Sequence, residues 1–218
     1  IIAEAGVNHN GSLERALKMV EVAAEAGADI IKFQTFDAKK VISQRTPKAG
    51  YQLRTTGDTE SMLEMAQKLE LDRKAHHSLV NHCKEREIEF LSSPFDLQSL
   101  SFLVDDLGLS KIKIGSGEIT NFPMLLALAQ SDSEIILSTG MSSVGEVEAA
   151  LGVIAYGLIN KDTPGEDSNI FAEAFSSLEG QDALLRSLSL LHCTTEYPSD
   201  FGDVNLRVMD TMREAFGL

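Results

Sequence analysis

The chain has 218 residues, of which 43% are hydrophobic and 24% are charged, and its formal net charge is −14. This length and apolar share are enough for one large domain with a sizeable core, and no stretch is apolar for the length of a membrane span. The acidic balance argues against nucleic acid or an anionic membrane as a partner.

The first residues and the cysteines indicate the compartment. Residues 1–4 lack the basic and long apolar regions of a signal peptide. The chain begins in a strand-like run without an initiator methionine, so we expect the natural protein to start earlier. Cys83 and Cys193 are too few for a disulfide framework and form no closely spaced pair, which favours the cytoplasm.

Short apolar runs alternate with amphipathic helical patterns along the chain. We expect Ser12 to cap the first helix and Gly27 to end it. The alternation predicts βαβ units and a parallel sheet, which is an α/β fold. The predicted strands cover residues 1–5, 29–35, 88–93, 111–114, 134–139 and 188–193.

Two architectures fit this rhythm, an open doubly wound sheet and a (β/α)8 TIM barrel. Strands of an open sheet are covered by helices on both faces and are continuously apolar. Here Ile31 and Phe33 alternate with Lys32 and Gln34, and Lys113 stands between isoleucines. Lysines that point away from the helices need a polar mouth, which a barrel has where its strands end. We therefore predict a barrel.

The chain accounts for about six βα units, and its last helix is expected over residues 205–216. We therefore predict that residues 1–218 form an incomplete barrel that lacks its last two units. Two segments break the rhythm. Residues 37–60 form a long polar segment typical of a lid-like loop. Residues 160–181 are expected to form a surface insertion with a short helix near residues 171–178.

Polar residues follow every predicted strand, at the edge where barrel enzymes hold their active sites. Lys32 and Lys113 supply positive charge, and Ser93, Ser116 and Ser138 supply hydroxyl and backbone N–H donors. This combination suits a phosphate.

Glu4 and Glu118 are the candidates for general acid–base work at the same edge. Five of these polar groups also have a structural interpretation, namely Lys32, Lys113, Glu4, Ser93 and Ser138. Lys32 can extend its ammonium to solvent from a strand end, and Glu4 can be the ion-pair partner of a lysine. Ser93 and Ser138 can be turn residues.

The histidines do not form a metal site by themselves. His192 is a single imidazole, which we expect to line a pocket or to accept or donate a hydrogen bond. His76, His77 and His82 fall on a helix face that we expect to be exposed. Cys193 is expected in the core.

Six segments resemble, in chain order, the sialic acid synthase family, which comprises N-acetylneuraminate synthase and its legionaminic and pseudaminic acid synthase relatives. One such motif is a weak signal, but six in order are a strong one. The resemblance covers almost the whole chain apart from the predicted insertion. The segments are residues 1–11, 32–35, 92–96, 113–118, 137–141 and 192–198, and residues 203–207 continue the series.

The resemblance implies a transferase of carbohydrate biosynthesis that uses phosphoenolpyruvate. The enol carbon attacks the open-chain aldehyde of an N-acylated amino sugar such as N-acetylmannosamine. Water then attacks C2 and phosphate leaves by C–O cleavage, which gives a nine-carbon 2-keto sugar acid. A divalent metal, Mn²⁺ or Mg²⁺, acts as Lewis acid in this family. The full-length protein is expected to be a homodimer.

The resemblance also implies roles for single residues. Lys32 and Lys113 correspond to phosphoenolpyruvate ligands, with Ser93, Ser116 and Ser138 around the phosphate. Ser93 replaces the threonine that is usual in the family, which keeps the hydroxyl.

Glu118 corresponds to the group that handles the proton of the attacking water, and Glu4 matches a glutamate near the substrate. Gln34 and Tyr197 correspond to contacts with the amino sugar or the aldehyde. Thr195 stands where some members have an asparagine that reaches phosphoenolpyruvate.

The family's two metal-ligating histidines belong to segments that this chain does not contain, so we expect the metal ligands to lie outside it. The C-terminal antifreeze-like domain of the family is absent as well. We therefore expect residues 1–218 to be the synthase domain of a longer enzyme, with little activity alone.

Two other functions remain open at this point. A Schiff-base aldolase on the same barrel would use Lys113 or Lys32 as its nucleophile. A non-catalytic remnant would bind phosphate or carbohydrate without turnover. The acceptor also stays open among N-acetylmannosamine, its 6-phosphate and the 2,4-diacetamido sugars.

Overall fold

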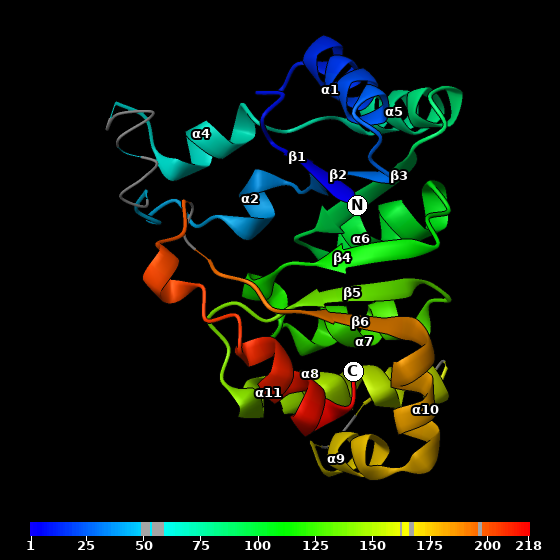
Figure 1. Cartoon of the computed structure of the whole chain (residues 1–218). Coiled ribbons are helices and arrows are strands. Elements are labelled where there is room, and N and C mark those ends of the chain that lie inside the picture. Colours follow the sequence, from blue (N-terminus) through cyan, green and yellow to red (C-terminus); the bar gives the residue numbers. More distant parts are fainter. Residues whose placement is uncertain (49–52, 54–58, 162, 166–167, 196–197) are drawn as a thin grey trace. The chain divides into compact units, whose positions relative to one another are not determined.

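The computed structural model describes residues 1–48, 53, 59–161, 163–165, 168–195 and 198–218 (Figure 1). The chain divides into two compact units, Ile1–Leu107 and Gly108–Leu218. Each unit holds a three-stranded parallel sheet whose strands are connected by helices. The predicted α/β class with parallel sheets is therefore confirmed, and all six predicted strands are present within two residues at each end.

Unit 1 has its strands in the order β1-β2-β3. They are β1 (Ile2–Gly6), β2 (Ile30–Thr35) and β3 (Glu89–Pro94). Its helices are α1 (Leu13–Glu25), α2 (Ala38–Val41), α4 (Met62–Gln67), α5 (Arg73–Glu85) and α6 (Leu97–Ser101), and the π-helical turn η1 (Phe102–Asp106) follows α6.

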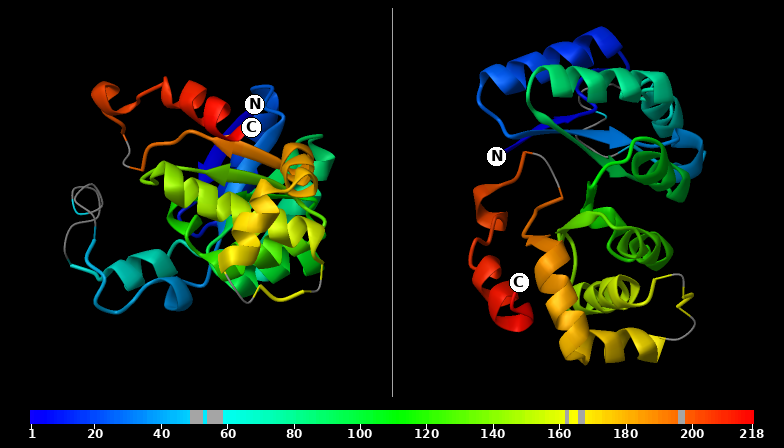
Figure 2. Two further views of the ribbon diagram at one scale, coloured as in Figure 1. Left: turned by 90° about the horizontal axis from the view of Figure 1, so that it is seen from below. Right: turned by 90° about the vertical axis from the view of Figure 1, so that its right-hand side faces the viewer.

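The two faces of the unit 1 sheet differ in polarity. Ile31, Phe33 and Thr35 of β2 are buried on one face, which α1 and α5 cover side by side (Figure 2). Lys32 and Gln34 alternate with them and therefore lie on the opposite face. The predicted alternation of β2 is thus the observed one.

Unit 2 has its strands in the order β4-β5-β6. They are β4 (Lys111–Ile114), β5 (Glu134–Ser138) and β6 (Leu188–Leu191). Its helices are α7 (Phe122–Gln130), α8 (Val144–Ile159), α9 (Ser168–Ser176), α10 (Leu178–Ser187) and α11 (Val208–Phe216), with 3-10 turns η2 (Ser116–Glu118) and η3 (Phe201–Asp203).

The unit 2 sheet repeats the same division. Ile112 and Ile114 of β4 and Ile135 and Leu137 of β5 are fully buried on one face. Lys113 lies between the two isoleucines and points to the other face. The helix α11 begins three residues later than the sequence predicted.

The segment at residues 160–181, which was expected to be a surface insertion with a short helix, does hold helical structure. It contributes α9 and the start of α10, which with α8 make the crossover from β5 to β6. The helix expected at residues 171–178 is interrupted because Ser177 caps α10, with its hydroxyl accepting from the Gly180 N–H at 3.0 Å. α9 packs closely on α8, since a Cβ at Gly152 would lie 2.9 Å from the Phe171 carbonyl oxygen.

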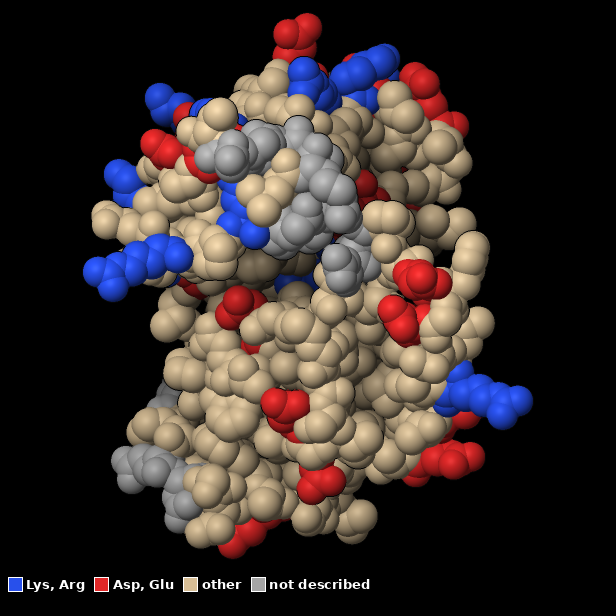
Figure 3. Space-filling view, turned by 90° about the vertical axis from the view of Figure 1, so that its left-hand side faces the viewer, with Lys and Arg blue, Asp and Glu red and all other residues tan. Residues whose placement is uncertain are grey.

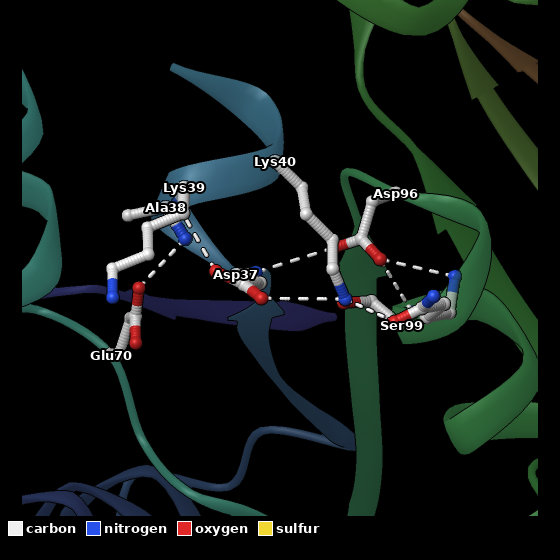
Figure 4. A network of polar contacts seen from close by, with 8 residues as sticks. Asp37, Ala38, Lys39, Lys40, Glu70, Asp96 and Ser99 are labelled. Carbon is white, nitrogen blue, oxygen red and sulfur yellow. Dashed lines mark hydrogen bonds and ion pairs between the residues drawn. The ribbon is translucent and has the colours of Figure 1, made fainter. Parts of the chain in front are cut away.

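The lid-like segment 37–60 is ordered at its start. Asp37 caps the short helix α2, and its backbone N–H donates to Asp96 at 3.2 Å (Figure 4). Glu70 accepts from the Ala38 N–H at 2.7 Å, and Lys40 pairs with Asp37 at 3.3 Å. Residues 49–52 and 54–58 of the predicted loop lie outside the described residues.

Surface charge and helix length relate to two partners that the sequence argued against, nucleic acid and membrane. On the face drawn in Figure 3, basic and acidic side chains are interspersed among uncharged atoms. Within the described part of the chain, every helix is too short or too polar to cross a membrane.

The ends of α1 confirm the predicted signals. The Ser12 hydroxyl accepts from the Arg15 N–H at 3.2 Å, and Gly27 follows the helix with φ +79°. Gly11, in the turn before α1, also has positive φ, at +73°. The two glycines differ in their surroundings: a Cβ at Gly11 would lie 2.3 Å from the Lys68 carbonyl oxygen, whereas nothing lies within 4 Å of a Cβ at Gly27.

We therefore expect Gly11→Ala to destabilise the protein more than Gly27→Ala. Both substitutions place a side chain in the left-handed region, which costs about 1–2 kcal/mol. Only Gly11→Ala also forces the Lys68 backbone to move, and overpacking adds about 1–3 kcal/mol. Chemical denaturation of the two variants measures the difference, and equal losses of unfolding free energy would contradict the close packing at Gly11.

Candidate active site

Glu4 and Lys32 form an ion pair on the polar face of the unit 1 sheet. The parallel register places Glu4 beside Lys32, and Lys32 Nζ contacts Glu4 Oε2. The Lys32 side chain is 13% exposed and that of Glu4 is 52% exposed. The structure thus supports the interpretation of Glu4 as the ion-pair partner of a lysine. It does not support the interpretation of Lys32 as a side chain that extends into solvent.

Gln34 and Ser93 lie on the same polar face, one step further along the strands. The register pairs Gln34 with Ser93, and Ser93 is buried within β3. Ser93 is therefore a strand residue, so its interpretation as a turn residue is wrong. Gly6, at the end of β1, lies next to this group and has a positive φ of +52°. A Cβ at Gly6 would lie 3.1 Å from Glu4 Oε1 and 3.9 Å from Gln34 Nε2.

Lys113 is buried in unit 2 with 8% of its surface exposed. Its Nζ donates to the Ile114 carbonyl at 2.9 Å and to Ser138 Oγ. The register pairs Lys113 with Ile136, so Ser138 lies two residues further along β5 on the same face. Cys193 Sγ donates to Ser138 Oγ at 3.0 Å, which joins a third strand end to the group.

Ser116 meets the loop after β5 through its hydroxyl, which accepts from the Gly140 N–H at 2.9 Å. A Cβ at Gly140 would lie 2.9 Å from Ser116 Oγ and 3.0 Å from Thr195 Cγ2. A larger residue at this position would therefore force the side chains of Ser116 and Thr195 to shift. The structure thus gathers four predicted residues of unit 2, Lys113, Ser116, Ser138 and Thr195, at one sheet edge.

Glu118 ends the 3-10 turn after β4 and is half-buried. Its Oε2 accepts from Asn121 Nδ2 at 2.8 Å. Sequence reasoning missed Asn121, although an asparagine directly before Phe122-Pro123 at a helix start is a recognisable N-cap signal.

A polar cavity of about 520 Å³ lies next to these strand ends in unit 2. Tyr197, which was expected to contact the sugar, falls outside the described residues. The described lining consists of Met141, Cys193, Thr194, Thr195, Pro198, Ser199, Asp200 and Asp203.

The prediction that His76 faces solvent is wrong. His76 is 1% exposed and its Nε2 lies 2.9 Å from Thr35 Oγ1. Its Nδ1–H donates to the Asp72 carbonyl at 2.9 Å. Burial lowers the pKa of His76, so its neutral ring joins a buried hydrogen-bond chain that continues from Thr35 to Ser92 at 2.7 Å. The sequence pattern did not show that His76, Thr35 and Ser92 form a polar group between α5 and the sheet.

The other histidines and Cys193 show mixed outcomes. His77 is exposed, as predicted, whereas His82 is partly buried beside Glu21. His192 makes the expected hydrogen bond, from Nε2 to the Val204 carbonyl at 2.6 Å. Cys193 is half-buried at the cavity rather than in the core, because β6 ends at Leu191, two residues before it.

No three His, Cys, Asp or Glu side chains are grouped as metal ligands in the described ranges. These residues therefore do not form a site for the divalent metal that the resemblance implies.

Comparison with known proteins identifies the family of the chain. The NeuB family model matches residues 19–218. The chain belongs to the NeuB family.

Curated relatives and a solved structure extend the match. The chain is 49% identical over its whole length to N,N'-diacetyllegionaminic acid synthase of Campylobacter jejuni, covering 58% of that protein. It is 39% identical to the Legionella pneumophila enzyme of the same name, covering 55% of it. N-acetylneuraminic acid synthetase of Leptospira borgpetersenii superposes with a TM-score of 0.72 at 29% identity, over 99% of this chain and 61% of that one.

This chain thus spans little more than half the length of these two curated relatives. Its match runs through both units, because the family model includes residues of β2 to β6. The family resemblance of the six sequence segments is therefore confirmed.

The two cysteines of the chain are expected to differ in reactivity. Burial raises the pKa of the Cys83 thiol to about 12, whereas Cys193 lines a cavity. Because the thiolate is the reactive form, a maleimide at pH 8 is expected to modify Cys193 in the folded protein and Cys83 only after unfolding. Peptide mass spectrometry measures this, with Cys193→Ser as control. Equal modification of both thiols in the folded state would refute the burial of Cys83.

Proposed function

We propose that this protein is a phosphoenolpyruvate-dependent sugar acid synthase. The observation that carries the proposal is the buried Lys113 ammonium held by Ser138, with Ser116 and the Gly140 N–H at the same sheet edge. A buried cation among hydroxyl and N–H donors is the combination that binds a phosphate or carboxylate group. The family membership supports this assignment of the anion.

In unit 1 we assign substrate binding to Lys32, Gln34 and Ser93. Glu4 neutralises Lys32 when no substrate is present. A bound dianion competes for the same ammonium and releases the half-exposed Glu4 carboxylate, which is then able to exchange a proton. Under this proposal the structural and the catalytic interpretations of Glu4 describe two states of one residue.

The proposed reaction forms one carbon–carbon bond and one carbon–oxygen bond, from water to C2, and it breaks the carbon–oxygen bond between C2 and phosphate. The C3 carbon of phosphoenolpyruvate attacks the aldehyde carbon of the sugar, and the aldehyde oxygen takes up a proton to become a hydroxyl. Water adds at C2, and Glu118 accepts its proton. The bond from C2 to the phosphate oxygen then breaks with its electron pair on phosphate. The proton of the new C2 hydroxyl passes to the leaving phosphate, and the 2-keto acid remains.

We further propose that the acceptor is a 2,4-diacetamido sugar. This rests on the two relatives named N,N'-diacetyllegionaminic acid synthase, at 49% and 39% identity. Phosphate release by the full-length protein, measured with this sugar, N-acetylmannosamine and its 6-phosphate in turn, tests the choice. A higher kcat/KM with N-acetylmannosamine would overturn it.

The remaining expectations belong to the same proposal. Each sheet has the parallel order and helical crossovers of three consecutive units of a (β/α)8 barrel, which supports a barrel as the complete fold. We also propose a cytoplasmic homodimer whose Mn²⁺ or Mg²⁺ is held by residues other than those described.

We expect Glu118→Gln in the full-length protein to lower kcat by about 10²- to 10⁴-fold, the usual contribution of a general acid or base. The amide keeps the size of the side chain, so the KM for phosphoenolpyruvate is expected to change little. Phosphate release under saturating substrate measures kcat. A rate equal to that of the unmodified protein would remove Glu118 from its role.

Lys113→Ala is expected to raise the KM for phosphoenolpyruvate by about 10- to 100-fold, because a hydrogen bond to a charged group contributes roughly 1.5–3 kcal/mol. Lys111→Ala is the matched control, since Lys111 lies on the same face of β4 but pairs with Glu134 at 3.4 Å. Equal effects of the two variants would argue against a specific anion contact at Lys113.

The Schiff-base alternative is tested separately. Borohydride reduction in the presence of pyruvate attaches a three-carbon group to Lys113 or Lys32 if either lysine forms an imine. Our proposal predicts an unchanged protein mass, and a modified lysine would favour the aldolase.

A further inference from the structure

Asn121 makes two hydrogen bonds with its side-chain amide, both at the start of α7. Its Oδ1 accepts from the Met124 N–H at 3.4 Å and caps the helix. Its Nδ2 donates to Glu118 Oε2 at 2.8 Å. The amide therefore joins the first turn of a buried helix to a carboxylate at the end of the preceding turn.

The helix fixes which way this amide faces. Only the oxygen of the amide can accept from the Met124 N–H, so the NH₂ group must point toward Glu118. The reversed amide would set its NH₂ against the Met124 N–H and its oxygen against the carboxylate. α7 is held in turn by Met124 and Leu125, which are fully buried. The donor to Glu118 is thus attached to the start of a buried helix.

We propose that Asn121 is a positioning residue for Glu118. This inference rests on the proposed function, in which Glu118 takes the proton of the attacking water. The bond from Nδ2 occupies Oε2 and fixes the plane of the carboxylate, so that Oε1 is the oxygen left to accept the proton. The short 3-10 turn alone would leave the side-chain torsions of Glu118 unrestrained.

The competing interpretation is that Asn121 is only a helix cap. Serine and aspartate are also good N-caps, but neither can donate an amide N–H to Glu118. Asn121→Ser therefore keeps the cap and removes the donor. Asn121→Asp keeps the cap and places a second carboxylate beside Glu118. Asn121→Ala removes both functions.

The test measures kcat, the KM for phosphoenolpyruvate and the melting temperature of these variants in the full-length protein. We expect Asn121→Ser to lower kcat about tenfold or more, with KM within threefold and the melting temperature near that of the unmodified protein. Asn121→Asp is expected to lose at least as much rate. Asn121→Ala should combine the rate loss with a lower melting temperature.

Two controls separate positioning from stability. Ser177→Ala removes the N-cap of α10, whose hydroxyl accepts from the Gly180 N–H, and should lower the melting temperature without changing kcat. In a Glu118→Gln background, Asn121→Ser should cause no further loss, because the carboxylate that it positions is gone.

The outcomes distinguish this inference from the function on which it rests. If the unmodified protein turns over and Glu118→Gln does not, an unchanged kcat in Asn121→Ser overturns the positioning role alone. If the unmodified protein releases no phosphate with any of the three acceptors, the proposed function is wrong and the positioning role is refuted with it.

Discussion

The two-residue alternation of the parallel strands is the constraint on which the candidate site residues depend. β4 buries Ile112 and Ile114 completely on one face, so Lys113 between them must point to the other. The same rule sends Lys32 away from Ile31 and Phe33 in β2. A register shift of one residue would place both lysines in apolar cores. The hydrophobic pattern that directs the folding of each sheet therefore also places one lysine, Lys32 or Lys113, on the face opposite the apolar core.

Much of the fold could be predicted from the sequence because local patterns determine it. Strand bounds follow from apolar runs, and the caps of α1 follow from Ser12 and Gly27. The errors arise where tertiary contacts override local pattern. His76 looks like an exposed polar residue in the sequence, but Thr35 and the Asp72 carbonyl are its hydrogen-bond partners in the folded protein. The packing of α9 depends on the close approach of Phe171 to Gly152.

The candidate site shows the same limit in a different form. Strand-end positions identified Lys113, Ser116 and Ser138, since the carboxyl ends of parallel strands share one edge. The sequence did not show that Cys193 donates to Ser138 or that the side chains of Ser116 and Thr195 both pack close to Gly140. These contacts join residues far apart in the chain, and only the packed loops decide them.

Helix caps and chemical groups compete for the same positions in this fold. A helix starts soon after each strand ends, so an Asn, Asp or Ser there serves equally well as an N-cap or as a site residue. A second partner separates the two uses. Asp96 caps α6 and also accepts from the Asp37 N–H, which fixes the start of segment 37–60. Asn121 caps α7 and also donates to Glu118. In both cases the contact outside the helix, rather than the cap itself, connects the residue to the surface where the strands end.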